Sequence, residues 1–245
     1  MALNIGKTAW NFAALRDCGR YHLFVDYHSR TIKYWCKILN YYNESRYVKK
    51  CYNQLFLHDR SGKKNWASGI RKLVCSLGFG YAWFSQSVGN EKIFLSQVKD
   101  RLKSISIQEL NAQCKLHFPE YLDYHPDPFA APYLSVLPDY HLRKYFASLH
   151  CNNLPVKCNL LSRINITENN LCESCQVPEN EFHILFECKL YEHLRLALLP
   201  RNIIDEPSKR IFISLLNSSD EELIKSVSRY LQLILKNREH FRLSD

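Results

Sequence analysis

Three cysteines and one histidine lie close together in the segment LCESCQVPENEFHILFEC, residues 171–188. These candidate ligands, Cys172, Cys175, His183 and Cys188, follow the pattern C-x2-C-x7-H-x4-C. Three thiolates and one imidazole are the ligand set of a closed tetrahedral zinc site, in which no position is left for water or a substrate. The segment therefore predicts bound Zn²⁺ with a structural rather than a catalytic role.

The spacing of the four residues is compatible with one ion. The two residues between Cys172 and Cys175 allow a tight turn to direct both sulfurs at it. His183 and Cys188 are five residues apart, a little over one helical turn, at the start of a helix predicted for EFHILFECKLYEHLRLALL. One alternative is a set of ordinary thiols in a reducing compartment. A thioredoxin-like redox pair is disfavoured because no strand leads into this CxxC.

The chain has 245 residues, of which 46% are apolar, and this length is sufficient for one large or two small domains. It contains ten cysteines but no signal peptide, which favours a nuclear or cytoplasmic protein with reduced thiols. No uncharged apolar run approaches 18 residues, so we expect no membrane-spanning helix and no membrane partner.

Helical periodicity of apolar residues recurs along most of the chain. It predicts a mainly α fold, with an N-terminal helical bundle, a small zinc-binding module and C-terminal helices. Helices are expected at about 29–39, from 43 or 44 through 56, at 64–77, from 90 to beyond 105, and at 139–149, 208–216 and 220–238. Trp35, Trp66 and Phe94 are expected in the core, and residues 19–27 could be extended.

Five of the nine prolines lie in residues 117–138, which we interpret as a linker between domains. The predicted division is a basic helical domain (1–116), this Pro-rich linker (117–138), and a zinc-binding domain with C-terminal helices (139–245). His125 is then expected to be an exposed loop residue.

The charge is unevenly distributed along the chain. Residues 1–110 contain 18 lysines and arginines and seven acidic residues, a net charge of +11. Residues 111–245 contain 15 lysines and arginines and 17 acidic residues, a net charge of −2. The first half is therefore predicted to bind RNA or DNA with little sequence preference, although a solvated basic surface is the alternative. The candidate contacts, on the polar sides of three successive helices, are Arg46, Lys49, Lys50, Lys63, Lys64, Arg71, Lys72, Lys99, Arg101 and Lys103.

No catalytic residues are predicted. Phe24-Val25-Asp26 is similar to the aromatic-x-Asp-Asp turn of a polymerase palm, but Tyr27 stands where a second carboxylate is needed. One carboxylate cannot hold the two metal ions of that reaction. A Cys/His hydrolase is the remaining enzymatic alternative, although no nucleophile and base form a recognisable motif.

Several segments are distinctive in combination: DCGRYHL (17–23), IKYWCKIL (32–39), YVKKCYNQLF (47–56), KKNWASGIRKLVCSLGFGYAW (63–83) and SKRIFISLLNSSDEELIKSVSRYLQLILKNRE (208–239). With the candidate zinc segment, they resemble the C-terminal region of LINE-type (non-LTR) retrotransposon reverse transcriptases, which follows the polymerase palm and ends in a zinc-binding domain. The resemblance implies a thumb-like and zinc-bearing structure that helps hold template RNA and target DNA, with the remaining reverse transcriptase domains as partners. Fingers, palm and endonuclease are absent from this chain.

The chain also departs from that family. The family usually carries a His followed by Leu-x-Ile-Glu and a Gly-Arg pair before the zinc ligands, and a Pro after the last Cys. Here the matching positions read Asn152, Leu154, Val156, Lys157, Asn159, Leu160 and Lys189. The resemblance therefore implies the metal more than the family's nucleic-acid contacts, and an inert or protein-interacting remnant without nucleic-acid binding is the alternative function.

Overall fold

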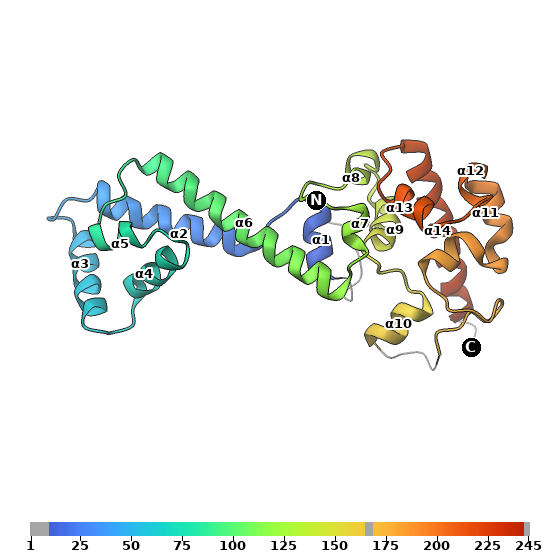
Figure 1. Cartoon of the computed structure of the whole chain (residues 1–245), viewed down its shortest axis with the longest axis horizontal. Helices are drawn as coiled ribbons and strands as arrows, with labels where there is room; N and C mark the ends of the chain where they lie inside the picture. Colours follow the sequence, from blue (N-terminus) through green and yellow to red (C-terminus); the bar gives the residue numbers. More distant parts are fainter. Residues whose placement is uncertain (1–9, 165–168, 243–245) are drawn as a thin grey trace. The chain divides into compact units, whose positions relative to one another are not determined.

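The computed structural model describes residues 10–164 and 169–242. The protein is mainly α, which confirms the predicted fold class (Figure 1). In the described residues there is no strand, and β-structure is limited to two isolated bridges, Cys18 with Ala130 and Leu171 with Pro178. Every helix in this part of the chain is too short or too polar to span a bilayer.

The chain forms two compact units. The central unit comprises residues 21–109, and the terminal unit comprises residues 1–20 together with 110–245. Helix α6 (Glu91–His117) belongs to the central unit through Glu109 and to the terminal unit from Leu110. Each unit buries its own apolar cluster.

The central unit contains α2 (Leu23–Asn40), α3 (Tyr47–Arg60), α4 (Trp66–Ser76), α5 (Gly80–Ser85) and most of α6. Trp35 and Phe94 are buried in its core, as the helical spacing predicts. The indole N–H of Trp35 donates to the Tyr52 hydroxyl at 2.9 Å, so the polar edge of this large side chain is satisfied. The Asn65 side chain caps α4, which explains why this helix begins where it does.

Two expectations for the central unit were wrong. Trp66 is 37% exposed rather than buried, because it is the first residue of α4. Its ring makes edge contacts with the rings of Tyr34 and Tyr52, at centroid distances of 6.0 and 6.4 Å. Residues 19–27, which by sequence could be extended, become helical from Leu23, where α2 starts. Asp26 therefore lies in the first turn of a helix.

The terminal unit is built from short helices around one long helix. Its helices are α1 (Asn11–Asp17), α7 (Tyr121–Tyr124), α8 (Tyr133–Val136), α9 (Tyr140–His150), α10 (Lys157–Ile164), α11 (Glu192–Leu198), α12 (Arg201–Ile204), α13 (Lys209–Leu216) and α14 (Glu221–Arg242). Helices α9 and α14 pack along one another. Helix α10 is not among the helices that the apolar periodicity predicts.

A buried carboxylate links four of these helices. Asp17 at the end of α1 is fully buried and accepts hydrogen bonds from the hydroxyls of Tyr121 at 2.6 Å and Tyr133 at 2.7 Å. The carboxylate also lies 2.8 Å from Nδ1 of His150 and accepts a hydrogen bond from the Cys151 thiol at 3.2 Å. Burial by itself raises the pKa of Asp17, but the His150 imidazole and the two hydroxyls hold that pKa below its ordinary value. Asp17 is therefore an ionised group that connects α1, α7, α8 and α9.

The compact units do not follow the predicted boundaries. Residues 117–138, expected to form a linker, contribute Tyr121 and Tyr133 to the terminal core, and His125 is 6% exposed rather than an exposed loop residue. Pro126 and Pro138 follow the ends of the short helices α7 and α8, whose tyrosine side chains are buried. Residues 10–20 belong to the same unit because α1 carries Asp17 into it, and Gly19 allows the chain to pass close to the backbone of Ala130. A Cβ at Gly19 would lie 2.7 Å from the backbone nitrogen of Ala130.

Candidate metal centre

The four predicted metal ligands come together in the terminal unit. One possible ligand atom from each of Cys172, Cys175, His183 and Cys188 lies within 4.8 Å of every other. Three of these residues are buried and Cys175 is half-buried. The group is therefore a Cys₃His cluster that could hold a metal ion.

The first two ligands lie on a tight turn. The N–H of Cys172 donates to the carbonyl of Val177 at 2.8 Å, and the N–H of Gln176 donates back to the carbonyl of Cys172 at 2.8 Å. Gln176 has φ of 57°, in the left-handed region, which reverses the chain directly after Cys175. This loop holds the two CxxC sulfurs on the same side of the turn.

The other two ligands are presented by one turn of π-helix rather than by an α-helix. The π-helix spans His183–Glu187, and the N–H of Cys188 donates to the carbonyl of His183 at 2.8 Å. In an α-helix, residues five apart point about 140° away from each other, because one turn takes 3.6 residues. The wider turn brings positions 183 and 188 to the same side. π-turns of this kind occur frequently at functional sites.

The predicted continuous helix after Glu181 is therefore wrong. The chain leaves helical geometry at Cys188, where ψ is 119°, and continues as a 3₁₀ turn (Lys189–Tyr191) and then α11. Lys189 occupies the position after the last cysteine, and its backbone N–H donates to Sγ of Cys175 at 3.4 Å. A proline, which has no N–H, could not make this contact.

Neighbouring side chains satisfy the backbone of the irregular turn. The Tyr230 hydroxyl of α14 donates to the carbonyl of Ile184 at 2.8 Å, and Arg195 of α11 donates to the carbonyl of Cys188 at 2.7 Å. The Asn180 side chain accepts from the N–H of His183 at 2.8 Å. The sequence analysis missed these three supporting residues. Asn180 could have been found, since an Asn three residues before a helical position is a common N-cap.

The His183 imidazole is oriented for ligation. Its Nδ1 lies 3.4 Å from a carboxylate oxygen of Glu187. Its Nε2 is buried and has no hydrogen-bond partner among the residues that the structure describes. Metal-binding histidines usually contact a carboxylate through the second ring nitrogen, and buried polar atoms are seldom left without a partner. Nε2 is therefore the ring nitrogen that would bind a metal ion held by this cluster.

The three thiols affect one another's ionisation. Sγ of Cys172 and Sγ of Cys188 are 3.8 Å apart. Burial raises the pKa of Cys188 to about 12. Burial also raises the pKa of Cys175, but hydrogen bonds from the Lys189 N–H and the neighbouring thiols lower it by more. The pKa of Cys175 is therefore below its ordinary value. Three adjacent thiolates need a cation to offset their mutual repulsion.

The ten basic residues predicted to contact nucleic acid all belong to the central unit. Three of them already contact acidic side chains: Lys49 lies 4.0 Å from Glu44, Arg71 lies 2.8 Å from Asp59, and Lys103 lies 4.0 Å from Asp100. The remaining seven are exposed, namely Arg46, Lys50, Lys63, Lys64, Lys72, Lys99 and Arg101.

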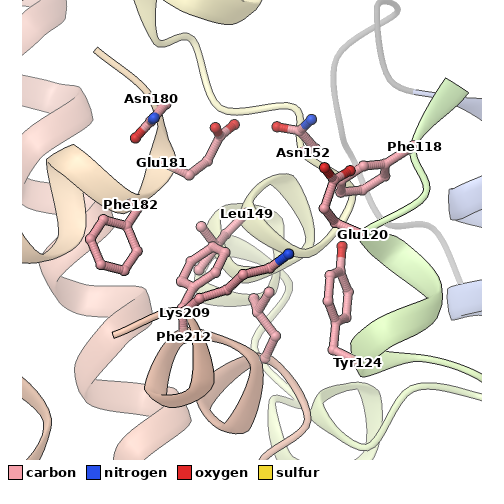
Figure 2. Close-up of a pocket in the computed structure, with 11 residues that line it drawn as sticks. Phe118, Glu120, Tyr124, Leu149, Asn152, Asn180, Glu181, Phe182, Lys209 and Phe212 are labelled. Atoms are coloured by element: carbon pink, nitrogen blue, oxygen red, sulfur yellow. The ribbon is translucent and has the colours of Figure 1, made fainter. Parts of the chain in front are cut away.

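One wall of a cavity in the terminal unit is formed by the segment that carries the four candidate metal ligands, residues 171–188, called the metal segment below. Its volume is about 520 Å³, within the range of small-molecule sites. Figure 2 shows Asn180, Glu181 and Phe182, which directly precede His183, along one side, with Lys209 and Phe212 of α13 nearby. The cavity is mainly apolar, and its Lys209 ammonium lies 3.7 Å from Asp123. The metal segment therefore also shapes this cavity.

Comparisons of the chain with protein families, with curated proteins and with solved structures find no match. The resemblance to LINE-type reverse transcriptases stays a prediction carried by the sequence segments.

Proposed function

We propose that this chain is a non-catalytic, zinc-stabilised nucleic-acid-binding module, related to the C-terminal region of LINE-type reverse transcriptases. The observation that carries this proposal is the distribution of charge between the two units. Residues 21–109 contain 15 lysines and arginines and six acidic residues, a net charge of +9. The rest of the chain contains 18 lysines and arginines and 18 acidic residues, a net charge of zero. All the excess positive charge of the protein therefore belongs to the central unit.

Such a concentration of charge favours a polyanion as partner. Seven of the predicted contacts are exposed lysines and arginines on a compact helical unit, and contacts with phosphates fix position without reading sequence. We therefore expect binding to RNA or DNA with little sequence preference. In the setting of a reverse transcriptase, this unit would help hold template RNA or target DNA.

The geometry of the cluster supports zinc as the metal. Zinc binds thiolate sulfur at about 2.3 Å, which places two sulfurs of a tetrahedral site about 3.8 Å apart. The sulfurs of Cys172 and Cys188 are separated by 3.8 Å. Zinc would cross-link the CxxC turn to the π-turn, and its four protein ligands would leave no position for a substrate.

The metal proposal is tested by elemental analysis of the purified protein. We expect one zinc per chain, and its loss in the double variant Cys172→Ser, Cys175→Ser. The control is Cys75→Ser, which replaces an exposed cysteine of the central unit. Stoichiometric zinc in the double variant would show that the assignment is wrong.

The nucleic-acid proposal is tested by fluorescence anisotropy with RNA and DNA over a series of salt concentrations. If about five or six phosphates are contacted, the slope of log affinity against log salt on duplex DNA should be about −4.5 to −5.4. The double variant Lys63→Gln, Lys64→Gln should bind all sequences more weakly and make the slope less negative by about 1.8.

The matched control replaces two basic residues of the terminal unit, Lys225→Gln and Arg229→Gln. A greater loss of affinity in this control would move the binding surface to the terminal unit. Absence of salt-dependent binding in the wild type would favour the alternative, a protein-interacting or inert remnant.

A further inference from the structure

One side of α2 carries aromatic and basic side chains in alternation. Tyr27, Tyr34 and Tyr41 are 67%, 46% and 69% exposed, and the exposed Arg30 and Lys37 lie between them in sequence. We call these five residues the α2 stripe. None of the five is among the residues that the sequence analysis proposed for nucleic-acid contact.

The spacing of the stripe places Tyr27, Arg30, Tyr34 and Lys37 on a single side of α2, and Tyr41 follows at its C-cap, still in αR geometry. Successive members are three or four residues apart, which corresponds to about one helical turn at each step. The opposite side of α2 carries Ile32 and Trp35 into the core of the central unit. The stripe is therefore left at the surface by the packing of the unit, and its tyrosines recur about every 10 Å along the helix.

Two adjoining hollows follow the stripe. The first has a volume of about 580 Å³ and is lined by Leu23, Asp26, Tyr27, Arg30, Thr31, Tyr34 and Trp66. The second has a volume of about 470 Å³ and is lined by Arg30, Lys33, Tyr34, Lys37, Tyr41 and Glu91. Because both include Arg30 and Tyr34, they form one continuous surface. Trp66 adds a fourth aromatic ring beside Tyr34.

The composition of this surface indicates an anionic partner with flat apolar parts. Its basic groups are Arg30, Lys33 and Lys37, against the carboxylates of Asp26 and Glu91. Glu91 also accepts a hydrogen bond from Asn40 at 3.0 Å. Exposed aromatic groups that gather in one place mark interaction sites more often than single exposed side chains do.

We propose that the α2 stripe, with Trp66 and Lys33, binds single-stranded nucleic acid. Unpaired bases stack on the tyrosine and tryptophan rings, while the basic side chains contact the phosphates between them. In a duplex the faces of the bases are covered by their neighbours, so these rings have no stacking surface to contact. This inference rests on the proposed function and specifies its substrate class.

The test compares a single-stranded oligonucleotide with a duplex of equal length, again by anisotropy. Stacking of one base is worth about 1–3 kcal/mol, a factor of roughly 5 to 150 in affinity. The double variant Tyr27→Ala, Tyr41→Ala should therefore lose at least about tenfold in affinity for the single strand and change duplex binding little. Its salt slope should be unchanged, since no charge is removed.

Two further measurements separate stacking from charge. The double variant Arg30→Gln, Lys37→Gln should make the single-strand salt slope less negative by about 1.4. Binding of the single strand should quench tryptophan fluorescence, and Trp66→Phe should remove most of that quenching. The matched control is Tyr47→Ala, Tyr81→Ala, since these tyrosines of the same unit are 81% and 59% exposed but lie outside the stripe.

The outcomes distinguish this inference from the proposed function. If the wild type binds single strands and duplexes with strong salt dependence but the tyrosine variant keeps its single-strand affinity, the stripe inference fails and the proposed function stands. If the wild type binds neither, the proposed function itself fails. A tyrosine variant that converts a dimer into a monomer in sedimentation, with unchanged affinity for nucleic acid, would identify the stripe as a contact between copies and overturn the inference.

Discussion

The two units of this protein bury different kinds of side chain. In residues 21–109, all of which the structure describes, Asp59 is the one buried charged residue, and the core is otherwise apolar apart from Ser68 and Ser106. The terminal unit buries a much larger polar set, which includes Arg16, Asp17, His125, Arg143, His150, Glu179, Glu181, His183 and Arg195.

The central unit keeps most of its charged side chains at the surface, whereas the terminal unit also buries charged side chains in its core. The central unit is stabilised mainly by apolar burial and keeps its basic groups at the surface, where a polyanion can reach them. The terminal unit uses ionised and polar groups internally, where each must keep its partner because an unpaired buried charge is costly. Changes of metal, charge or pH should therefore destabilise the terminal unit first.

Metal removal should give the largest difference between the units. Structural zinc contributes roughly 10–16 kcal/mol of apparent binding energy in small zinc domains, which is comparable with the whole stability of a typical domain. After chelation, the amides of Leu185 and Phe186 in the π-turn should lose protection in hydrogen exchange, while those of α2 and α4 should keep it. A uniform loss of protection in both units would show that they are not separable.

Replacement of Asp17 should have the next largest effect. In Asp17→Asn the partners in α7, α8 and α9 remain buried but lose the charge they surround, so we expect a loss of about 3–5 kcal/mol in the free energy of unfolding. Urea denaturation followed by far-UV circular dichroism would measure it. The control Asp26→Asn changes an exposed aspartate of α2 and should alter stability by less than about 0.5 kcal/mol.

Acid should act through the same carboxylate. The folded-state pKa of Asp17 is lowered, so its contribution to stability is fully present above the unfolded-state pKa of about 4 and is lost as the pH falls through the folded value. The stability difference between the wild type and Asp17→Asn should accordingly shrink below about pH 4. A difference that instead grows on acidification would contradict the assignment of Asp17 as ionised.

The smallest loss of stability among these changes is expected for Asp59→Asn, in the central unit. Asp59 accepts two hydrogen bonds from the Arg71 guanidinium, at 2.8 and 3.2 Å, but Arg71 is partly exposed to solvent. Asp59→Asn should therefore cost about 1–2 kcal/mol, measured by denaturation of the same protein. A larger cost than that of Asp17→Asn would reverse the comparison of the two units.

The sequence determined the features that depend on local spacing. Apolar periodicity predicts most of the helices, the ligand pattern predicts which four residues meet, and the uneven charge predicts which half of the chain is basic. Each of these depends on residues that are near one another in the chain, where helical repeat and turn length limit the possible geometry.

The tertiary structure decided what depends on distant partners. Asp17 meets Tyr133, 116 residues away, and this contact draws residues 117–138 into a core that periodicity alone could not predict. The π-turn at His183 is stabilised by Arg195 and Tyr230 from later helices. Trp66, at the first position of α4, stays 37% exposed although its helical spacing predicted burial. The packing of a side chain depends on which surfaces compete for burial, and those surfaces are brought together only when the whole chain folds.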